Sequence, residues 1–160
     1  VVVCLQLFLS ACYSKGVPVS SGDTHQPAPI PVELTTHLGD QQTFVEGDEI
    51  QFLLSIGSDA YIYMYHMDAT GAITQLIPNV QQQNHFYNAG YFMTLPEYDN
   101  GYRFIVRGPA GEQNVWVFAS DVDATGADKD QTIDRIRNLI KQASGSYGEA
   151  QLLLNTVKRK

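Results

Sequence analysis

The residues with the clearest capacity for chemistry are closely spaced oxygen ligands that follow residue 120. They fill the first, third, fifth and turn positions of a twelve-residue calcium-binding loop: Asp121, Asp123, Thr125 and Gly126. The twelfth position is Thr132, which cannot supply the bidentate carboxylate that closes such a loop. We therefore expect an acidic turn, with an aspartate of residues 128–130 capping a following helix, and no metal site.

Other acids, bases and nucleophiles form no recognisable catalytic set. No G-x-S-x-G motif is present, and the four histidines lack metal-ligand spacing: His25, His37, His66 and His85. Asn84-His85 lies in a glutamine-rich stretch that predicts a solvated loop. Glu97 and Asp99 supply two carboxylates, but their spacing does not establish the pair of a glycan hydrolase. We expect no catalytic residue and no cofactor.

The charge of the chain excludes one large class of partner. Its 160 residues carry a net charge of −7, and the sequence pI is near 4.8. Binding to nucleic acid needs clustered Lys and Arg, and the basic cluster here is the terminal stretch of residues 158–160. We therefore expect no nucleic-acid partner.

The first twelve residues, VVVCLQLFLSAC, have the pattern of an export signal. The apolar run is too short to span a bilayer, which takes about 20 residues, but it matches the hydrophobic region of a signal peptide. Ser10-Ala11 supplies the small residues of a cleavage site. We predict a signal peptide over residues 1–11, and we expect a few residues, with a positive charge, to precede Val1.

Leu9-Ser10-Ala11-Cys12 resembles the lipobox of bacterial lipoprotein precursors. That resemblance implies that the thiol of Cys12 is acylated and that Cys12 becomes the first residue of the mature protein. In such precursors an Asp after the cysteine commonly signals retention in the inner membrane, and here Tyr13 follows. The resemblance therefore implies anchoring in the lipid of the outer membrane, on its periplasmic face.

The residues after Cys12 are rich in Pro, Ser and Gly, with prolines at positions 18, 27, 29 and 31. Such a composition buries little apolar surface and predicts an extended spacer. We therefore expect a tether over residues 12–42 and a single globular domain over residues 43–160.

The domain has mostly the period of β-strands. Apolar residues alternate over residues 50–56, and residues 60–67 are bulky on both faces, which predicts a central strand. Further strands are expected over residues 73–77, 91–95, 101–107 and 114–120. Residues 131–143 switch to a helical period, and residues 152–157 close the chain as a strand or a short helix. The sequence predicts an antiparallel β-sandwich of about 6–7 strands with a C-terminal helix.

Three apolar residues of this domain have two interpretations. Trp116 alternates with apolar neighbours and is either part of the core or an aromatic anchor at an interface. Ile136 and Ile140 lie four residues apart on the helical stripe, which either packs on the sheet or docks a partner.

Turns and strand starts carry a resemblance to domain-of-unknown-function family 4384. The matching segments are residues 44–50, 59–63, 71, 76–79, 90, 108–111 and 115–116. They span roughly residues 43–120, about half of the chain. The family resemblance implies a bacterial envelope protein, often a lipoprotein, and implies no catalytic residues.

The expected function is therefore that of a non-catalytic structural or binding subunit of an envelope assembly, such as a secretion or surface-organelle complex, with protein partners. The alternative is a small envelope hydrolase that acts on wall or glycan through carboxylates such as Glu97 and Asp99.

Overall fold

The computed structural model describes residues 28–124 and 132–160, so Cys12 and the expected signal peptide lie outside the described residues. The elements in chain order are β1 (Val32–Thr36), β2 (Thr43–Val45), β3 (Glu49–Ile50), β4 (Phe52–Ile56), β5 (Ala60–Met67), β6 (Ile73–Ile77), β7 (Phe86–Tyr87), β8 (Met93–Leu95), the 3-10 helix η1 (Tyr98–Asn100), β9 (Phe104–Ile105), β10 (Gly111–Ser120), α1 (Ile133–Ala143) and β11 (Tyr147–Val157).

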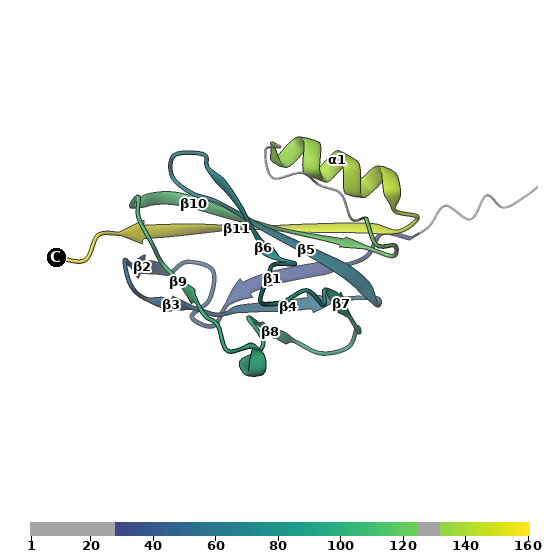
Figure 1. Ribbon diagram of the computed structural model, residues 1–160, viewed down its shortest axis with the longest axis horizontal. Coiled ribbons are helices and arrows are strands. Elements are labelled where there is room, and N and C mark those ends of the chain that lie inside the picture. Colours follow the sequence, from purple (N-terminus) through teal and green to yellow (C-terminus); the bar gives the residue numbers. More distant parts are fainter. Residues whose placement is uncertain (1–27, 125–131) are drawn as a thin grey trace, which may run out of the picture.

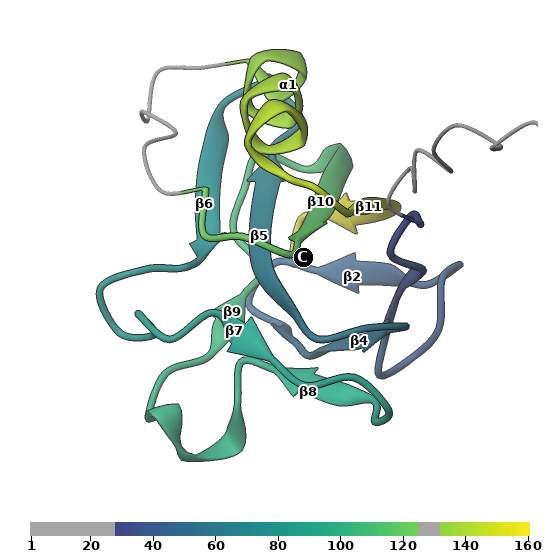
Figure 2. The ribbon, with the colours of Figure 1, turned by 90° about the vertical axis from the view of Figure 1, so that its right-hand side faces the viewer.

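These elements stack in three layers (Figure 1). The central layer is a six-stranded sheet in the order β2-β11-β10-β5-β6, with β7 paired to β5. Helix α1 covers one face of this sheet, above β5 and β10 (Figure 2), and the three-stranded sheet β1-β4-β8 covers the other. The short β3–β9 pair lies toward the end of the sandwich at which β2 is found (Figure 1).

Side-chain alternation on β5 explains why this strand is buried on both faces. Ile62 and Met64 point into the inner core between the two sheets, and neither is exposed. Tyr63 and Tyr65 point to the other face, where they pack in a second cluster under α1. Because β10 pairs with β5 in register and alternates in the same way, the two strands carry both cores. The expected central strand over residues 60–67 is confirmed.

The second cluster decides how the helix and Trp116 are used. Ile136 and Ile140 are 2% and 0% exposed, and Trp116 is 7% exposed, all within one cluster between α1 and the sheet. The hypothesis that these three residues form a partner interface is therefore wrong for this structure, because their own domain already covers them. Thr132 caps the helix by accepting a bond from the backbone N–H of Arg135, so the cap is not an aspartate of residues 128–130.

The folded domain begins before residue 43, which corrects the expected boundary of the tether. Strand β1 pairs antiparallel with β4 along its whole length, from Val32 opposite Ile56 to Thr36 opposite Phe52. Val32 and Leu34 pack against the inner core, and Ile30 is buried within it. Residues 28–42 therefore belong to the fold, and the Pro-rich composition there does not mark a spacer.

The mainly β, antiparallel fold with one helix near the C-terminus is confirmed, with differences of detail. Several strands have only two or three residues, so the strands are more numerous than expected. Strand β11 resolves the open alternative for residues 152–157, and it pairs parallel with β2. Within the described parts of the chain, no helix has the length and apolar character needed to cross a membrane.

Candidate binding cleft

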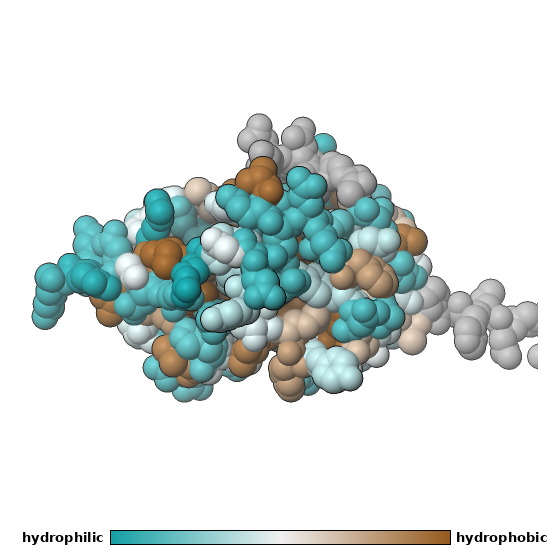
Figure 3. All heavy atoms as spheres, turned by 60° about the horizontal axis from the view of Figure 1, so that its bottom comes forward, coloured by the Kyte–Doolittle hydropathy of each residue, from teal (hydrophilic) through white to brown (hydrophobic). Residues whose placement is uncertain are grey.

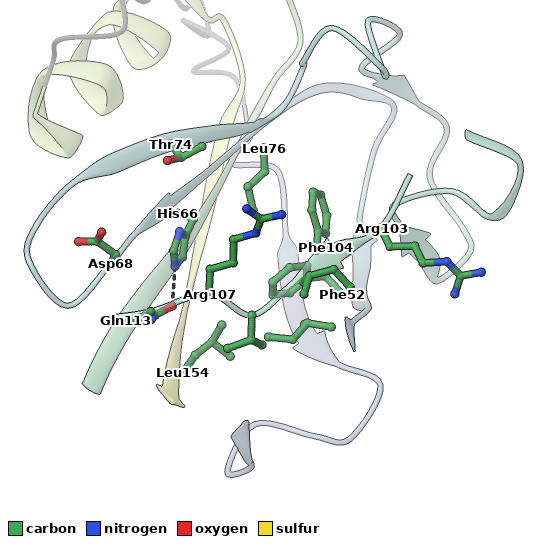
Figure 4. Close-up of a pocket in the computed structure, with 14 residues that line it drawn as sticks. Phe52, His66, Asp68, Thr74, Leu76, Arg103, Phe104, Arg107, Gln113 and Leu154 are labelled. Atoms are coloured by element: carbon green, nitrogen blue, oxygen red, sulfur yellow. Dashed lines mark hydrogen bonds between the residues drawn. The ribbon is translucent and has the colours of Figure 1, made fainter. Parts of the chain in front are cut away.

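A cleft of about 400 Å³ opens at one end of the inner core (Figure 4). Its floor is apolar and combines residues from five strands and the segment after β9: Ile50, Phe52, Leu76, Phe104, Val106 and Leu154. Its polar and charged lining consists of His66, Asp68, Thr74, Arg103, Arg107 and Gln113. A cleft of this size and composition is typical of small-molecule sites, which range over about 300–1,000 Å³.

One side of the cleft is polar because the inner faces of three strands end in polar residues. His66 follows Ile62 and Met64 on the inner face of β5, and it is partly exposed. Gln113 begins the inner face of β10, and Thr156 ends that of β11; both are buried. The hydrophobic filling of the sandwich therefore stops at this end, and a set of hydrogen-bonding groups takes its place.

A hydrogen-bond network fixes the imidazole of His66 in the wall of the cleft. The Nε2 of Gln113 donates to the carbonyl oxygen of Pro109 (3.0 Å) and to the Oγ1 of Thr156 (3.1 Å). Because a carbonyl oxygen only accepts, the Oε1 of Gln113 must face His66, whose Nε2 lies 2.7 Å away and donates to it. The Nδ1 of His66 is the other ring nitrogen that can form a hydrogen bond, and it has no partner within residues 28–124 and 132–160.

The two arginines of the cleft differ in their partners. Arg103 forms an ion pair with Glu49, with 2.7 Å between Nη1 and Oε2, and this hydrogen bond raises the pKa of the guanidinium. Its side chain points away from the cleft, whereas that of Arg107 extends through it (Figure 4). Backbone bonds from Gly47 to Val106 and from Val106 to Asp48 hold the chain next to Arg107. Arg107 therefore extends into the cleft from the segment after β9, which these backbone bonds hold in place.

Asp68 lies on the rim but serves mainly the adjacent turn. Its Oδ1 accepts bonds from the backbone N–H groups of Thr70 (2.8 Å) and Ala72 (3.0 Å) and from the hydroxyl of Thr70 (2.6 Å). The hydroxyl bond is the main cause of a lowered pKa for the Asp68 carboxyl. Gly71 has φ of 88°, which favours glycine. Residues 68–71 therefore form a tight turn between β5 and β6.

The cleft is not recognised from the sequence patterns, which indicate no role for His66, Arg107 or Gln113. One feature of the sequence could have indicated the cleft: His66 continues the apolar face of Ile62 and Met64 in a strand that is buried on both faces. The arrangement combines an apolar surface with a guanidinium and an oriented imidazole, which suits binding of a ligand that has both apolar and polar parts.

The acidic residues after β10 hold the fold together. The carboxylate of Asp121 accepts bonds from the backbone N–H groups of Gly145 (2.9 Å) and Ser146 (2.8 Å) and so fixes the chain between α1 and β11. The Oδ1 of Asp123 accepts from the hydroxyl of Tyr63 (2.8 Å). Thr125 and Gly126 lie outside the described residues. No three His, Cys, Asp or Glu side chains come together as a metal site in the described ranges.

The histidines occupy separate places. His85 is buried, which corrects the expectation of a solvated loop for this residue, whereas Asn84 beside it is exposed. The loop is drawn in because the carbonyl of His85 accepts a bond from the N–H of Ile62 (2.7 Å), and the ring packs edge-on against Tyr63. The Nδ1 of His37 lies 3.2 Å from the backbone N–H of Gln51, and His25 is outside the described residues.

Glu97 and Asp99, the carboxylates of the alternative hydrolase, lie at η1. Both are exposed, and neither belongs to the lining of the cleft. The carbonyl of Glu97 accepts from the N–H of Asn100 as η1 turns. The structure therefore places these carboxylates away from the cleft.

Exposed hydrophobic side chains are a weaker candidate for a binding surface. Val80, Tyr91 and Phe92 are 83%, 79% and 65% exposed on the loops around β7 and β8. The face viewed in Figure 3 is mostly hydrophilic, with hydrophobic residues in separate small patches. Scattered exposed apolar residues are normal for soluble domains, whereas the cleft gathers its apolar residues in one place.

Comparison with protein families matches residues 43–123 to the family described as "Domain of unknown function (DUF4384)". No curated protein and no solved structure matches the chain. The family match ends before α1 and β11, although β11 lies between β10 and β2 in the central sheet. Because the match extends over half of the 160 residues, the chain belongs to the DUF4384 family.

Proposed function

We propose that this protein is an outer-membrane lipoprotein, anchored through an acylated Cys12, whose domain is a non-catalytic binding subunit of an envelope assembly such as a secretion or surface-organelle complex. The observation that carries the anchoring is the apolar run that ends in Leu9-Ser10-Ala11-Cys12. The domain then faces the periplasm, and its partners are proteins of the assembly.

Binding is favoured over hydrolysis by the roles that the reactive side chains already have. Asp121 and Asp123 accept bonds that hold the chain in place, and His66 donates to Gln113 in the wall of the cleft. The cleft is floored by core residues, which gives a rigid apolar surface. A rigid apolar surface with few polar groups supports recognition, because little order has to be gained on binding.

The earlier start of the fold shortens the expected tether. Residues 13–27 separate Cys12 from the described domain. Fully extended, a segment of this length spans at most about 54 Å, since each residue contributes about 3.3–3.6 Å. The proposed anchor therefore keeps the domain within that distance of the membrane surface.

The anchoring is tested with two cysteine variants of the full-length protein in its own host. Cys12→Ala should lose the acyl label and leave the membrane fraction, or accumulate unprocessed. Cys4→Ala is the matched control, because it changes the other cysteine inside the predicted signal peptide and should keep both label and membrane fraction. Stable anchoring needs more than one acyl chain, so mass spectrometry should find at least two. Equal labelling and fractionation of the two variants would remove the lipoprotein from the proposal.

A further inference from the structure

The lining of the cleft carries one cationic group that lacks a partner. Arg107 is exposed, and its guanidinium forms neither an ion pair nor a hydrogen bond within the parts of the chain that the structure describes. Figure 4 shows its side chain running through the cleft in the direction of Leu76. A guanidinium held beside apolar side chains is placed to meet an anion, since it offers several donors in one plane.

The other charged groups of the cleft are already engaged. Arg103 is compensated by Glu49, and its side chain points away. Asp68 accepts three hydrogen bonds from its own turn. The chain has 10 basic and 17 acidic residues, yet within the described residues no carboxylate forms an ion pair with Arg107. The charge available to a ligand is therefore the single positive charge of Arg107. The carboxylate of Asp68 on the rim would repel a second anionic group of the same ligand.

The floor beside Arg107 is fixed and apolar. Phe52 is 2% exposed and forms an edge-to-face pair with Phe104, whose ring centroid lies 5.7 Å away. Phe104 is partly exposed and packs in turn against Tyr102. An alkyl chain laid on this floor would lose contact with water without any rearrangement of the core.

We propose that the cleft binds a small carboxylate that carries an apolar chain, with the carboxylate paired to Arg107 and the chain on the floor formed by Phe52 and Phe104. This inference rests on the proposed function of a binding module and names the ligand class of its cleft. The pair is charge-assisted and bidentate in geometry, which makes it directional as well as attractive.

The test uses the full chain labelled with ¹⁵N and three probes of equal chain length: octanoate, octan-1-ol and octylammonium. Each is added below its micellar concentration, and amide shifts are followed by NMR. Octanoate should shift amides of the cleft, at β3, β6 and residues 103–108, with an affinity about tenfold higher than that of octanol. Octylammonium should bind more weakly than octanol, because its charge repels Arg107.

Three variants locate the charge. Arg107→Gln should remove the preference for octanoate over octanol and keep the octanol shifts. Arg135→Gln is the matched control: it removes an exposed arginine from α1, on the other side of the central sheet, and should bind as the wild type does. Asp68→Asn keeps the oxygen that accepts the bonds of its turn, and it should strengthen octanoate binding because a negative charge leaves the rim.

The proposal is overturned if octanoate causes no cleft shifts, if it binds no better than octanol, or if Arg107→Gln and Arg135→Gln behave alike. These outcomes are independent of the anchoring test, because acylation of Cys12 is read from labelling and fractionation. If the wild-type protein shows no preference for octanoate over octanol while its lipidation is intact, the proposed function stands and this ligand class is excluded.

Discussion

The backbone of Ile30 lies against Gly148 so closely that a Cβ built on Gly148 would sit 2.0 Å from the carbonyl oxygen of Ile30. The N–H of Ile30 also donates to the carbonyl of Tyr147, at 2.9 Å. This contact joins the start of the described fold to the start of β11, more than a hundred residues later in the chain. Glycine at position 148 is required because no side chain fits between the two backbones.

Gly148→Ala is therefore expected to destabilise the domain by about 1–3 kcal/mol, as overpacking does in a well-packed core. Gly108→Ala is the control, because a Cβ there would meet the Oε1 of Glu46 at an ordinary 3.5 Å. Urea denaturation of the two variants measures the difference. Equal midpoints would contradict the close approach of Ile30 and Gly148.

The helix should respond to substitution as a part of the core. Ile136→Ala and Ile140→Ala are each expected to cost about 2–5 kcal/mol, because both side chains are buried between α1 and the sheet. Leu139→Ala is the matched control on the same helix, since Leu139 is 41% exposed. Thermal or urea unfolding checks the order. A control that destabilises as strongly as the buried positions would show that the helix packs differently.

Two tyrosines of one cluster should differ because of their hydroxyl groups. The hydroxyl of Tyr63 donates to Asp123 and accepts from the N–H of Ala124, whereas that of Tyr65 is buried with no hydrogen-bond partner in the described residues. Tyr63→Phe is expected to cost about 1–3 kcal/mol. Tyr65→Phe should be neutral or stabilising, because an unsatisfied polar atom is removed. A loss in Tyr65→Phe as large as in Tyr63→Phe would refute this difference.

The buried hydroxyl of Tyr65 should also make the stability of the domain sensitive to alkaline pH. Burial raises the pKa of Tyr65 to about 12, above its ordinary value of 10.0. A pKa that is raised in the folded state means that folding favours the neutral phenol. The stability of the folded state relative to the unfolded state is therefore fully present below pH 10, and part of it is lost as pH rises through about 12. In urea denaturation over about pH 9–12, the midpoint concentration of urea should fall as pH rises, and it should fall less in Tyr65→Phe than in the wild type. An equal fall in both proteins would show that ionisation of Tyr65 does not cause the loss of stability.

Asp121 should act as a structural acceptor. Asp121→Ala removes the bonds to the N–H groups of Gly145 and Ser146 and is expected to lower the melting temperature by a few degrees. Calcium should leave the melting temperature of the wild type unchanged, because the loop lacks its closing carboxylate. A rise of many degrees with calcium that disappears in Asp121→Ala would establish a metal site.

Short stretches of sequence predicted those elements in which apolar side chains repeat with the period of one type of secondary structure. Residues 60–67 are bulky on both faces and form the central strand β5, and the apolar stripe of residues 133–140 forms the buried side of α1. In both cases the period of the element and the burial of its faces agree, so a short window of sequence contains the information.

Strand β1 and the cleft were missed because distant residues create them. Val32, Leu34 and Thr36 alternate for only five residues beside prolines, and pairing with β4 is what makes them a strand. The cleft draws its lining from segments between Ile50 and Leu154, which the register of β5, β10 and β11 brings together. No window of sequence contains the contact between His66 and Gln113, which depends on that register.

The place of β11 in the central sheet has a consequence for the timing of folding. This strand lies between β10 and β2, so the sheet lacks an interior member until residues 147–157 have been synthesised. Pairing of β2 and β10 to it spans long loops, which must close before their contacts are gained. A chain that emerges from its N-terminus therefore cannot complete the central sheet, and leaves the edges of β2 and β10 unpaired, until residues 147–157 have followed.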